Sequence, residues 1–351
     1  MSKASADIPV IDISPSNSEA AKQILAAAEN NGFLFIENNA AAGMPPAKVD
    51  EMFDLSKQFF QGPVENKKEC PTQNNRGWVS MQQETLDPGN QKRGDFKEYI
   101  QSRSFLLVSL TTRHRAFNLG EFTNNKPNQP LPKPFSNNVN TVADFSNSCH
   151  ALCNRILELF AEALDIPSDW FSSRHDQSKG ASGTIMRLLY YPSVPDNLAP
   201  EEDDIRAGAH SDYGTLTLLF QLPSQPGLEI LTPSGTWSSV PIDPKNTLST
   251  DPSAPLPVLV NIGDLMSYWT NGLLKSTVHR VIFPKEARKG GEDRYSMAYF
   301  CHPLDDAELV AVPSKRIEQY KGEGGVEKGG KVLTAKDHLL ERLAATYGTK
   351  A

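Results

Sequence analysis

Between residues 184 and 303 the sequence consists of short β-rich runs that alternate with turns. Strands of about 4–8 residues at such spacing are typical of a β-sandwich or a β-barrel. No internal repeat of about 20–50 residues is visible, so neither a solenoid nor a propeller is indicated. This region therefore predicts a compact β-structure at the centre of the fold.

Outside this region, several stretches carry apolar residues at steps of three and four, the period of an amphipathic helix. We predict helices at residues 18–30, 45–61, 142–164 and 335–347. The Pro- and Asn-rich segment at residues 123–137 lacks this period, and we interpret it as a surface connection. The pattern as a whole predicts an α+β chain that is mainly β.

The composition is that of a soluble globular protein, and it excludes several classes of function. Of 351 residues, 38% are hydrophobic and 22% are charged, with a net charge of −7. Acidic and basic residues are interspersed, whereas a nucleic-acid-binding surface would show a basic stripe, so we predict no nucleic-acid partner. The 4 cysteines are too few to form a disulfide framework in a chain of this length. Because no leader-like or membrane-spanning run is visible, we predict a cytoplasmic protein without a membrane partner.

Two segments of the β-rich region contain residue types that bind transition metals. His210 and Asp212 are separated by one residue, just before the apolar run that begins at Thr215. Side chains at i and i+2 leave a strand on the same face, so we expect the imidazole and the carboxylate to converge. A second strand-like run, STVHRVIF, supplies His279. Two imidazoles and one carboxylate are the ligands of the facial triad that holds non-heme Fe(II) and leaves coordination positions open.

Taken alone, the His-x-Asp spacing is common, and a hydrogen-bonded surface pair is the simpler interpretation. Arg294 and Ser296 change the balance, because their spacing places a guanidinium and a hydroxyl on one face of a later strand. This pair suits one end of a dicarboxylate, through charge-assisted hydrogen bonds. Together, the metal ligands and the Arg294–Ser296 pair indicate a 2-oxo acid. One end of it would chelate the metal, and the other end would bind Arg294 and Ser296. A buried ion pair between Arg294 and an acidic residue is the alternative.

The order of motifs along most of the chain resembles the isopenicillin N synthase-like family of iron(II)/2-oxoglutarate-dependent oxygenases. The motifs are IPVID at residues 8–12, NGFLFI at 31–36, RGW at 76–78, DFKEY at 95–99, RLLYYP at 187–192, GLEI at 227–230, WSSVP at 237–241, NIGD at 261–264 and TNG at 270–272. The resemblance implies a double-stranded β-helix (jelly-roll) core with flanking N-terminal helices and a C-terminal helix. We predict a single domain over residues 1–351, with a support region at 1–170, the jelly-roll at 184–303 and a tail with a helix at 304–351.

The same resemblance implies a role for each candidate residue of the site. The implied ligands are His210, Asp212 and His279 for Fe(II), and Arg294, Ser296 and Tyr191 for 2-oxoglutarate. The family couples decarboxylation of 2-oxoglutarate and consumption of O2 to hydroxylation, desaturation or ring rearrangement of a substrate. For this chain we expect a small-molecule metabolite, with secondary metabolism as the setting.

Three further residues are candidates for contacting the substrate. Arg187 shares a strand face with Tyr191, so it is expected to line the pocket and pair with an acidic or carbonyl oxygen; a structural ion pair fits equally well. Phe300 follows Ser296 by four residues on the same strand face, where it would stack on a flat substrate or serve as an ordinary core residue. Tyr99 is a candidate by family position alone.

Two alternatives to a 2-oxoglutarate-dependent dioxygenase remain open from the sequence. An oxidase like isopenicillin N synthase shares the triad and the Arg-x-Ser pair, yet takes all its electrons from the substrate. A non-catalytic barrel that binds a small ligand is disfavoured, because it needs no converging metal ligands. We expect no obligate protein partner. The histidines outside the motif are interpreted as structural or surface groups: His114, His150, His175, His302 and His338.

Overall fold

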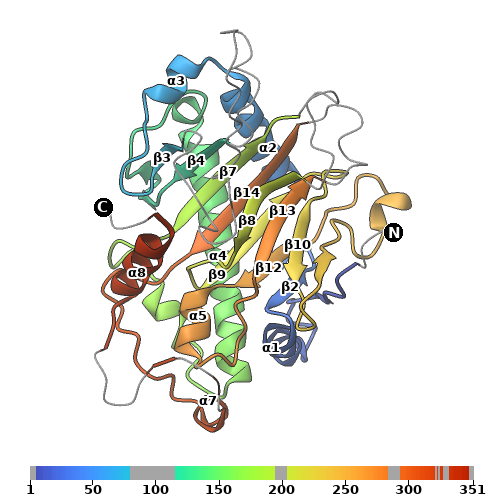
Figure 1. Cartoon of the computed structure of the whole chain (residues 1–351), viewed down its shortest axis with the longest axis vertical. Helices are drawn as coiled ribbons and strands as arrows, with labels where there is room; N and C mark the ends of the chain where they lie inside the picture. The colour runs from blue at the N-terminus through green and yellow to red at the C-terminus, as the bar shows by residue number, and fades with distance from the viewer. Residues whose placement is uncertain are drawn as a thin grey trace.

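The computed structural model describes residues 5–79, 115–193, 204–283, 293–320, 322, 325–326 and 332–347. Within these ranges, two β-sheets occupy the centre of the molecule (Figure 1). The larger sheet has eight strands, in the spatial order β1 (Val10–Ile11), β2 (Phe33–Ile36), β12 (Val258–Ile262), β9 (Leu216–Gln221), β14 (Arg294–Cys301), β7 (Ile185–Tyr191), β4 (Arg115–Leu119) and β3 (Gly77–Val79). The smaller sheet has four, in the order β11 (Trp237–Ser239), β10 (Leu228–Leu231), β13 (His279–Phe283) and β8 (Asp204–His210). A separate short hairpin joins β5 (Phe122–Thr123) to β6 (Lys126–Pro127).

Strand β14 shows how the sequence divides its side chains between two environments. Successive side chains of a strand point to opposite faces of the sheet. One set packs into the main hydrophobic core: Tyr295, Met297, Tyr299 and Cys301. The alternate set lines a pocket between the sheets: Arg294, Ser296, Ala298 and Phe300. The period-2 pattern of RYSMAYFC therefore builds the core and the wall of the pocket with the same eight residues.

Helices cover the outer face of the larger sheet, and α4 runs behind its strands in Figure 1. The covering helices are α1 (Ala20–Asn30), α2 (Pro46–Gln61) and α4 (Val139–Ala163). Each presents its apolar stripe to the sheet, which buries leucine, isoleucine and phenylalanine side chains away from water. The remaining helices are the short α3 (Val64–Lys68), α5 (Asp264–Trp269) and α7 (Lys315–Gln319), and the C-terminal α8 (Ala335–Tyr347). The four helices predicted from periodicity are confirmed, with α4 beginning at Val139 rather than at residue 142.

The two sheets pack face to face through a second, smaller cluster of buried side chains. It brings Tyr191 and Leu259 of the larger sheet together with Leu228 and Val281 of the smaller one. The main core, by contrast, draws on residues from Ile11 to Ala335 and is continuous. It includes many side chains of α1, α2 and α4, and only the first residue of α8. This continuity supports our proposal that the chain is a single domain.

Within the described ranges, every helix is too short or too polar to cross a membrane. Tyr99, the substrate-contact candidate named from family position, lies outside the described residues.

Candidate active site

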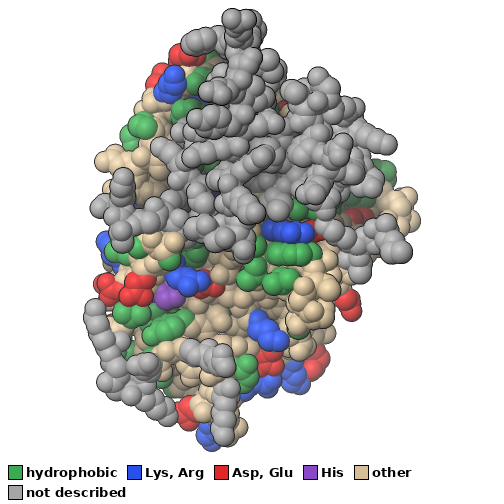
Figure 2. Space-filling view, in the orientation of Figure 1, with side chains coloured by type: hydrophobic (Ala, Val, Ile, Leu, Met, Phe, Trp, Pro, Cys, Tyr) green, Lys and Arg blue, Asp and Glu red, His purple; other side chains and the backbone are tan. Residues whose placement is uncertain are grey.

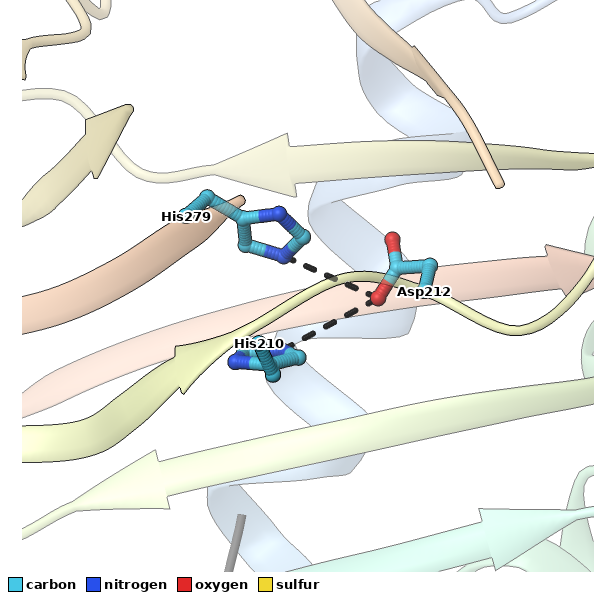
Figure 3. Close-up of side chains that lie close together, drawn as sticks. All are labelled: His210, Asp212 and His279. Atoms are coloured by element: carbon cyan, nitrogen blue, oxygen red, sulfur yellow. Dashed lines mark ion pairs between the residues drawn. The ribbon is translucent and has the colours of Figure 1, made fainter. Parts of the chain in front are cut away.

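The structure brings His210, Asp212 and His279 together at one end of the smaller sheet (Figure 3). His210 ends β8 and His279 begins β13, and the two residues are direct partners in the antiparallel pairing of these strands. Oδ1 of Asp212 lies 3.9 Å from Nε2 of His210 and 3.6 Å from Nε2 of His279. One ligand atom from each residue lies within 4.8 Å of the others, so a single ion could contact all three.

The local backbone differs from our expectation for this motif. We predicted that His210 and Asp212 share a face at the start of one strand, and this was wrong. The strand ends at His210, and Asp212 lies in the turn that leads to β9. RAGAH is itself extended and pairs with β13, so the apolar run after Thr215 begins a different strand, in the other sheet. The ligands therefore converge through strand pairing and a turn rather than through strand alternation.

Backbone carbonyls orient both imidazoles toward the carboxylate. Nδ1 of His210 lies 2.7 Å from the Gly208 carbonyl oxygen, and Nδ1 of His279 lies 3.1 Å from that of Thr277. A carbonyl oxygen only accepts, so Nδ1 carries the proton in both rings and Nε2 keeps its lone pair. Burial, and then the nearby His279 ring, lowers the pKa of His210 to about 4. Both features favour the neutral imidazole that metal ions require.

Asp212 is held by two hydrogen bonds to the oxygen that faces away from the histidines. The Thr217 hydroxyl and the Asn261 amide each donate to Oδ2, both at 2.7 Å. Burial raises the pKa of Asp212, but the two histidines and these hydrogen bonds outweigh it and lower the pKa overall. Oδ1 is thus left for a metal. Asn261, the first residue of the NIGD motif, lies in β12 and positions this carboxylate.

We expect Asn261→Ala to weaken Fe(II) binding by about 10–100-fold, the usual effect of removing a hydrogen bond that orients a metal ligand. The loss arises because Oδ2 of Asp212 would keep only the Thr217 hydroxyl, so the carboxylate could rotate. Anaerobic titration of the apoprotein with Fe(II) measures the effect. Asn147→Ala, an exposed residue on α4, is the matched control and should bind Fe(II) like the wild type. Equal Fe(II) affinities for Asn261→Ala and wild type would contradict this role.

Arg294 is a buried cation in the same pocket as the triad, with 3% of its surface exposed. Its guanidinium donates to the Gln225 carbonyl at 3.2 Å, to Ser296 Oγ at 3.3 Å and to Gln221 Oε1 at 3.3 Å. It also lies 5.2 Å from the centre of the Tyr191 ring.

Every one of these partners is uncharged, and within the described ranges no carboxylate forms an ion pair with Arg294. Burial lowers the pKa of Arg294, with only a small opposing effect from Tyr191. A buried charge without a counter-ion is unfavourable, so this site is suited to a bound anion. The buried-ion-pair alternative for Arg294 therefore finds no support.

One pocket joins the triad to Arg294, and its walls come from both sheets and from α8. The predicted substrate contacts Arg187 and Phe300 both line it, whereas Tyr99 lies outside the described residues. Sequence reasoning missed several lining residues, because no motif marks them and they come from distant segments. They are Asn75, Gly183, Tyr213, His302, Leu339 and Leu343.

The C-terminal helix is linked to the metal-ligand turn by a chain of polar contacts. Arg342 of α8 forms an ion pair with Asp264, the first residue of α5. The same carboxylate accepts a hydrogen bond from Ser211 at 3.0 Å, and Ser211 stands between two of the candidate ligands. Leu339 and Leu343 on the same helix close one side of the pocket. The position of α8 is thus tied to the geometry of the site.

Comparison with known proteins identifies the class to which this fold and site belong. The profile of the 2OG-Fe(II) oxygenase superfamily matches residues 182–303, and that of the N-terminal region of non-haem dioxygenases in morphine synthesis matches residues 8–118. A UPF0676 protein of Schizosaccharomyces pombe is 32% identical over 99% of this chain and 95% of its own length. The 2-oxoglutarate-dependent dioxygenase citB of Monascus ruber is 29% identical over 99% of this chain and 98% of its own length.

Solved structures give the same result. A full-length Neurospora crassa protein, solved in complex with alpha-KG and thymine, has a TM-score of 0.72 and 28% identity, covering 98% of this chain and 99% of that chain. A putative 2OG-Fe(II) oxygenase family protein of Caulobacter crescentus has a TM-score of 0.72 and 25% identity, covering 97% and 99%. The chain belongs to the 2OG-Fe(II) oxygenase superfamily. It is an iron(II)- and 2-oxoglutarate-dependent dioxygenase that uses O2, and the jelly-roll fold predicted from the sequence is confirmed.

Proposed function

We propose that His210, Asp212 and His279 hold the Fe(II) ion and that Arg294 holds the distal carboxylate of 2-oxoglutarate. The observation that carries this assignment is the buried guanidinium, which forms no ion pair with a carboxylate of the described residues and shares one pocket with three converging metal donors. Ser296 and Tyr191 line the pocket beside Arg294, so they are placed to bind the same carboxylate. When bound, iron supplies O2 activation, with 2-oxoglutarate oxidised to succinate and CO2 as the substrate C–H bond is oxidised.

The residues of this chain contribute binding, orientation and exclusion of water. The neutral imidazoles and the oriented Asp212 carboxylate would hold the metal ion with three protein ligands, which would leave coordination positions for other ligands. The apolar side chains of Leu189, Leu219 and Val281 lie between the charged ends of the pocket and exclude water. The comparisons favour this dioxygenase function over the oxidase and over the non-catalytic barrel considered from the sequence.

For the substrate, we propose a small planar metabolite with uncharged hydrogen-bonding edges, such as a pyrimidine base. The support is the combination of an aromatic ring, Phe300, with the polar side chains of Arg187 and Asn75 in one pocket. The likeness to the Neurospora crassa protein solved with thymine supports the same class. The test is thymine-dependent succinate formation by the Fe(II)-loaded protein. Succinate formation that no pyrimidine base stimulates would contradict this substrate class.

Arg187→Ala should raise the KM for thymine by about 10–100-fold, because a hydrogen bond to a charged group contributes about 1.5–3 kcal/mol. The KM for 2-oxoglutarate should stay within about 2-fold of the wild-type value, since Arg294 holds that ligand at another part of the pocket. Steady-state kinetics with each ligand varied in turn measures both constants. Arg155→Ala, an exposed arginine on α4, is the matched control. Equal increases in the KM for thymine and the KM for 2-oxoglutarate would contradict a substrate-specific role for Arg187.

That the chain has no nucleic-acid, membrane or obligate protein partner stays a prediction. On the part of the surface that Figure 2 shows in colour, acidic and basic side chains are interspersed rather than gathered into a basic stripe. This supports our proposal that the chain acts on small molecules rather than on nucleic acid. A cytoplasmic location and independence from a protein partner remain proposals from the sequence.

A further inference from the structure

The strand pairing orders the pocket from one end to the other. Along β14, Arg294 lies opposite Tyr191 of β7, while Phe300 lies opposite Thr217 of β9. Thr217 donates a hydrogen bond to Asp212, so this metal ligand lies nearer to Phe300 than to Arg294 along the strands. Arg294 and Phe300 are six positions apart on β14, which corresponds to about 20 Å along the strand. His302 follows Phe300 by two residues and therefore lies beyond the metal ligands, at the end of the pocket farthest from Arg294.

His302 is a buried imidazole with no described hydrogen bond. It is 5% exposed, it lines the pocket, and its Nδ1 has no partner among the residues that the structure describes. His175 shows the contrast, because its two ring nitrogens lie 2.8 Å from the Phe171 carbonyl oxygen and 2.9 Å from the Thr215 hydroxyl. Most buried polar atoms have such partners, so an unpaired ring nitrogen in the wall of a pocket calls for an explanation. Our earlier interpretation of His302 as structural therefore does not account for its surroundings.

The main chain of two glycines packs closely against the edges of the His302 ring. A Cβ atom at residue 183 would lie 3.2 Å from Nδ1, and one at residue 214 would lie 2.9 Å from Nε2. Any side chain at either position would collide with the imidazole, so glycine at both makes room for the ring at this end of the pocket. Leu339 of α8 closes the same end of the pocket with apolar surface. Apolar and main-chain atoms therefore surround the polar His302 ring at this end of the pocket.

The protonation state of His302 limits what it can bind. Burial, and then the charge of nearby His338, lowers the pKa of His302 to about 3. The ring is therefore neutral near pH 7 and offers one N–H donor and one lone pair. A neutral ring provides no counter-charge for a carboxylate. It matches an uncharged group such as an amide, an imide, a ring N–H or a carbonyl.

We propose that His302 binds the substrate directly, by a hydrogen bond to an uncharged amide-like edge at the end of the pocket opposite the 2-oxoglutarate site. This inference deepens the proposed function and rests on it. Phe300, one inward-facing position before His302, would contact the flat face of the same molecule. His302 thereby selects cyclic amides and imides over apolar rings of the same size.

The test measures anaerobic binding of thymine, uracil and 2-pyrrolidinone to the Fe(II)- and 2-oxoglutarate-loaded protein by calorimetry. Two apolar variants, His302→Leu and His302→Phe, should bind whichever probe the wild type binds about 10-fold or more weakly, because the polar edge is left unpaired. His302→Asn keeps a donor and an acceptor close to the ring position and should restore affinity to within about 3-fold of wild type. The affinity for 2-oxoglutarate should be unchanged in all variants, which also shows that each is folded.

The possible failures are distinguishable. If the wild type binds a probe and both apolar variants bind it equally well, the role of His302 is overturned while the substrate class stands. If the wild type binds none of the cyclic amides, the substrate class and the role of His302 fall together. If His302→Asn binds as weakly as His302→Leu, while 2-oxoglutarate binding is retained, the hydrogen-bonding role is also overturned.

Discussion

Replacing Arg294 with Leu should raise the KM for 2-oxoglutarate by about 100-fold or more. Two charge-assisted hydrogen bonds from the guanidinium to a carboxylate contribute about 1.5–3 kcal/mol each, and about 1.4 kcal/mol corresponds to tenfold in affinity. The measurement is succinate formation at increasing 2-oxoglutarate concentration with the substrate held at saturation. An unchanged KM would contradict the assignment of Arg294 to the co-substrate.

The stability of the same variant provides a second, independent readout. Arg294 has no acidic partner among the described residues, so its replacement breaks no ion pair, and the ligand-free protein should lose little stability. Arg280 is the matched control, because it lies in an ion pair with Glu229 at 2.8 Å, and that carboxylate is 1% exposed. Arg280→Leu should lower the free energy of unfolding by about 3–5 kcal/mol while 2-oxoglutarate binding persists. Urea unfolding of both variants without ligands measures this contrast.

His279→Ala should abolish retention of Fe(II) and reduce activity by about 1000-fold or more. Removing one of three protein ligands leaves a single imidazole and a carboxylate, and metal catalysis supplies several kcal/mol of barrier reduction. The measurements are the iron content after anaerobic reconstitution and the rate of succinate formation. His150→Ala, at a histidine on α4 outside the pocket, should retain both iron and activity. Full iron content in His279→Ala would show that the metal lies elsewhere.

The strand and helix pattern could be predicted because it depends on local periodicity. The three- and four-residue steps of apolar side chains in α4 and the alternation in β14 are visible in the sequence alone. The same alternation predicted that Arg294 and Ser296 share one face of their strand. The structure places both side chains in the pocket. In these two elements, the spacing of apolar residues along the chain determines which side chains face the core.

The features that could not be predicted depend on contacts between distant segments. Asn261 reaches Asp212 across 49 positions of the chain, and His302 lies beside Gly183 because β14 pairs with β7. No local spacing encodes such contacts. The position of His210 was also wrong: we placed it at the start of a strand, whereas RAGAH forms an edge strand that ends at His210 and pairs with β13. Tertiary pairing outweighed the weak local preference there.

We propose that a single pocket binds Fe(II) through His210, Asp212 and His279 and holds 2-oxoglutarate beside the metal. The most direct measurement is anaerobic titration of the Fe(II)-loaded wild-type protein with 2-oxoglutarate, followed by visible absorption. We predict a weak metal-to-ligand charge-transfer band that saturates with 2-oxoglutarate. An iron-replete protein that develops no band would contradict the claim.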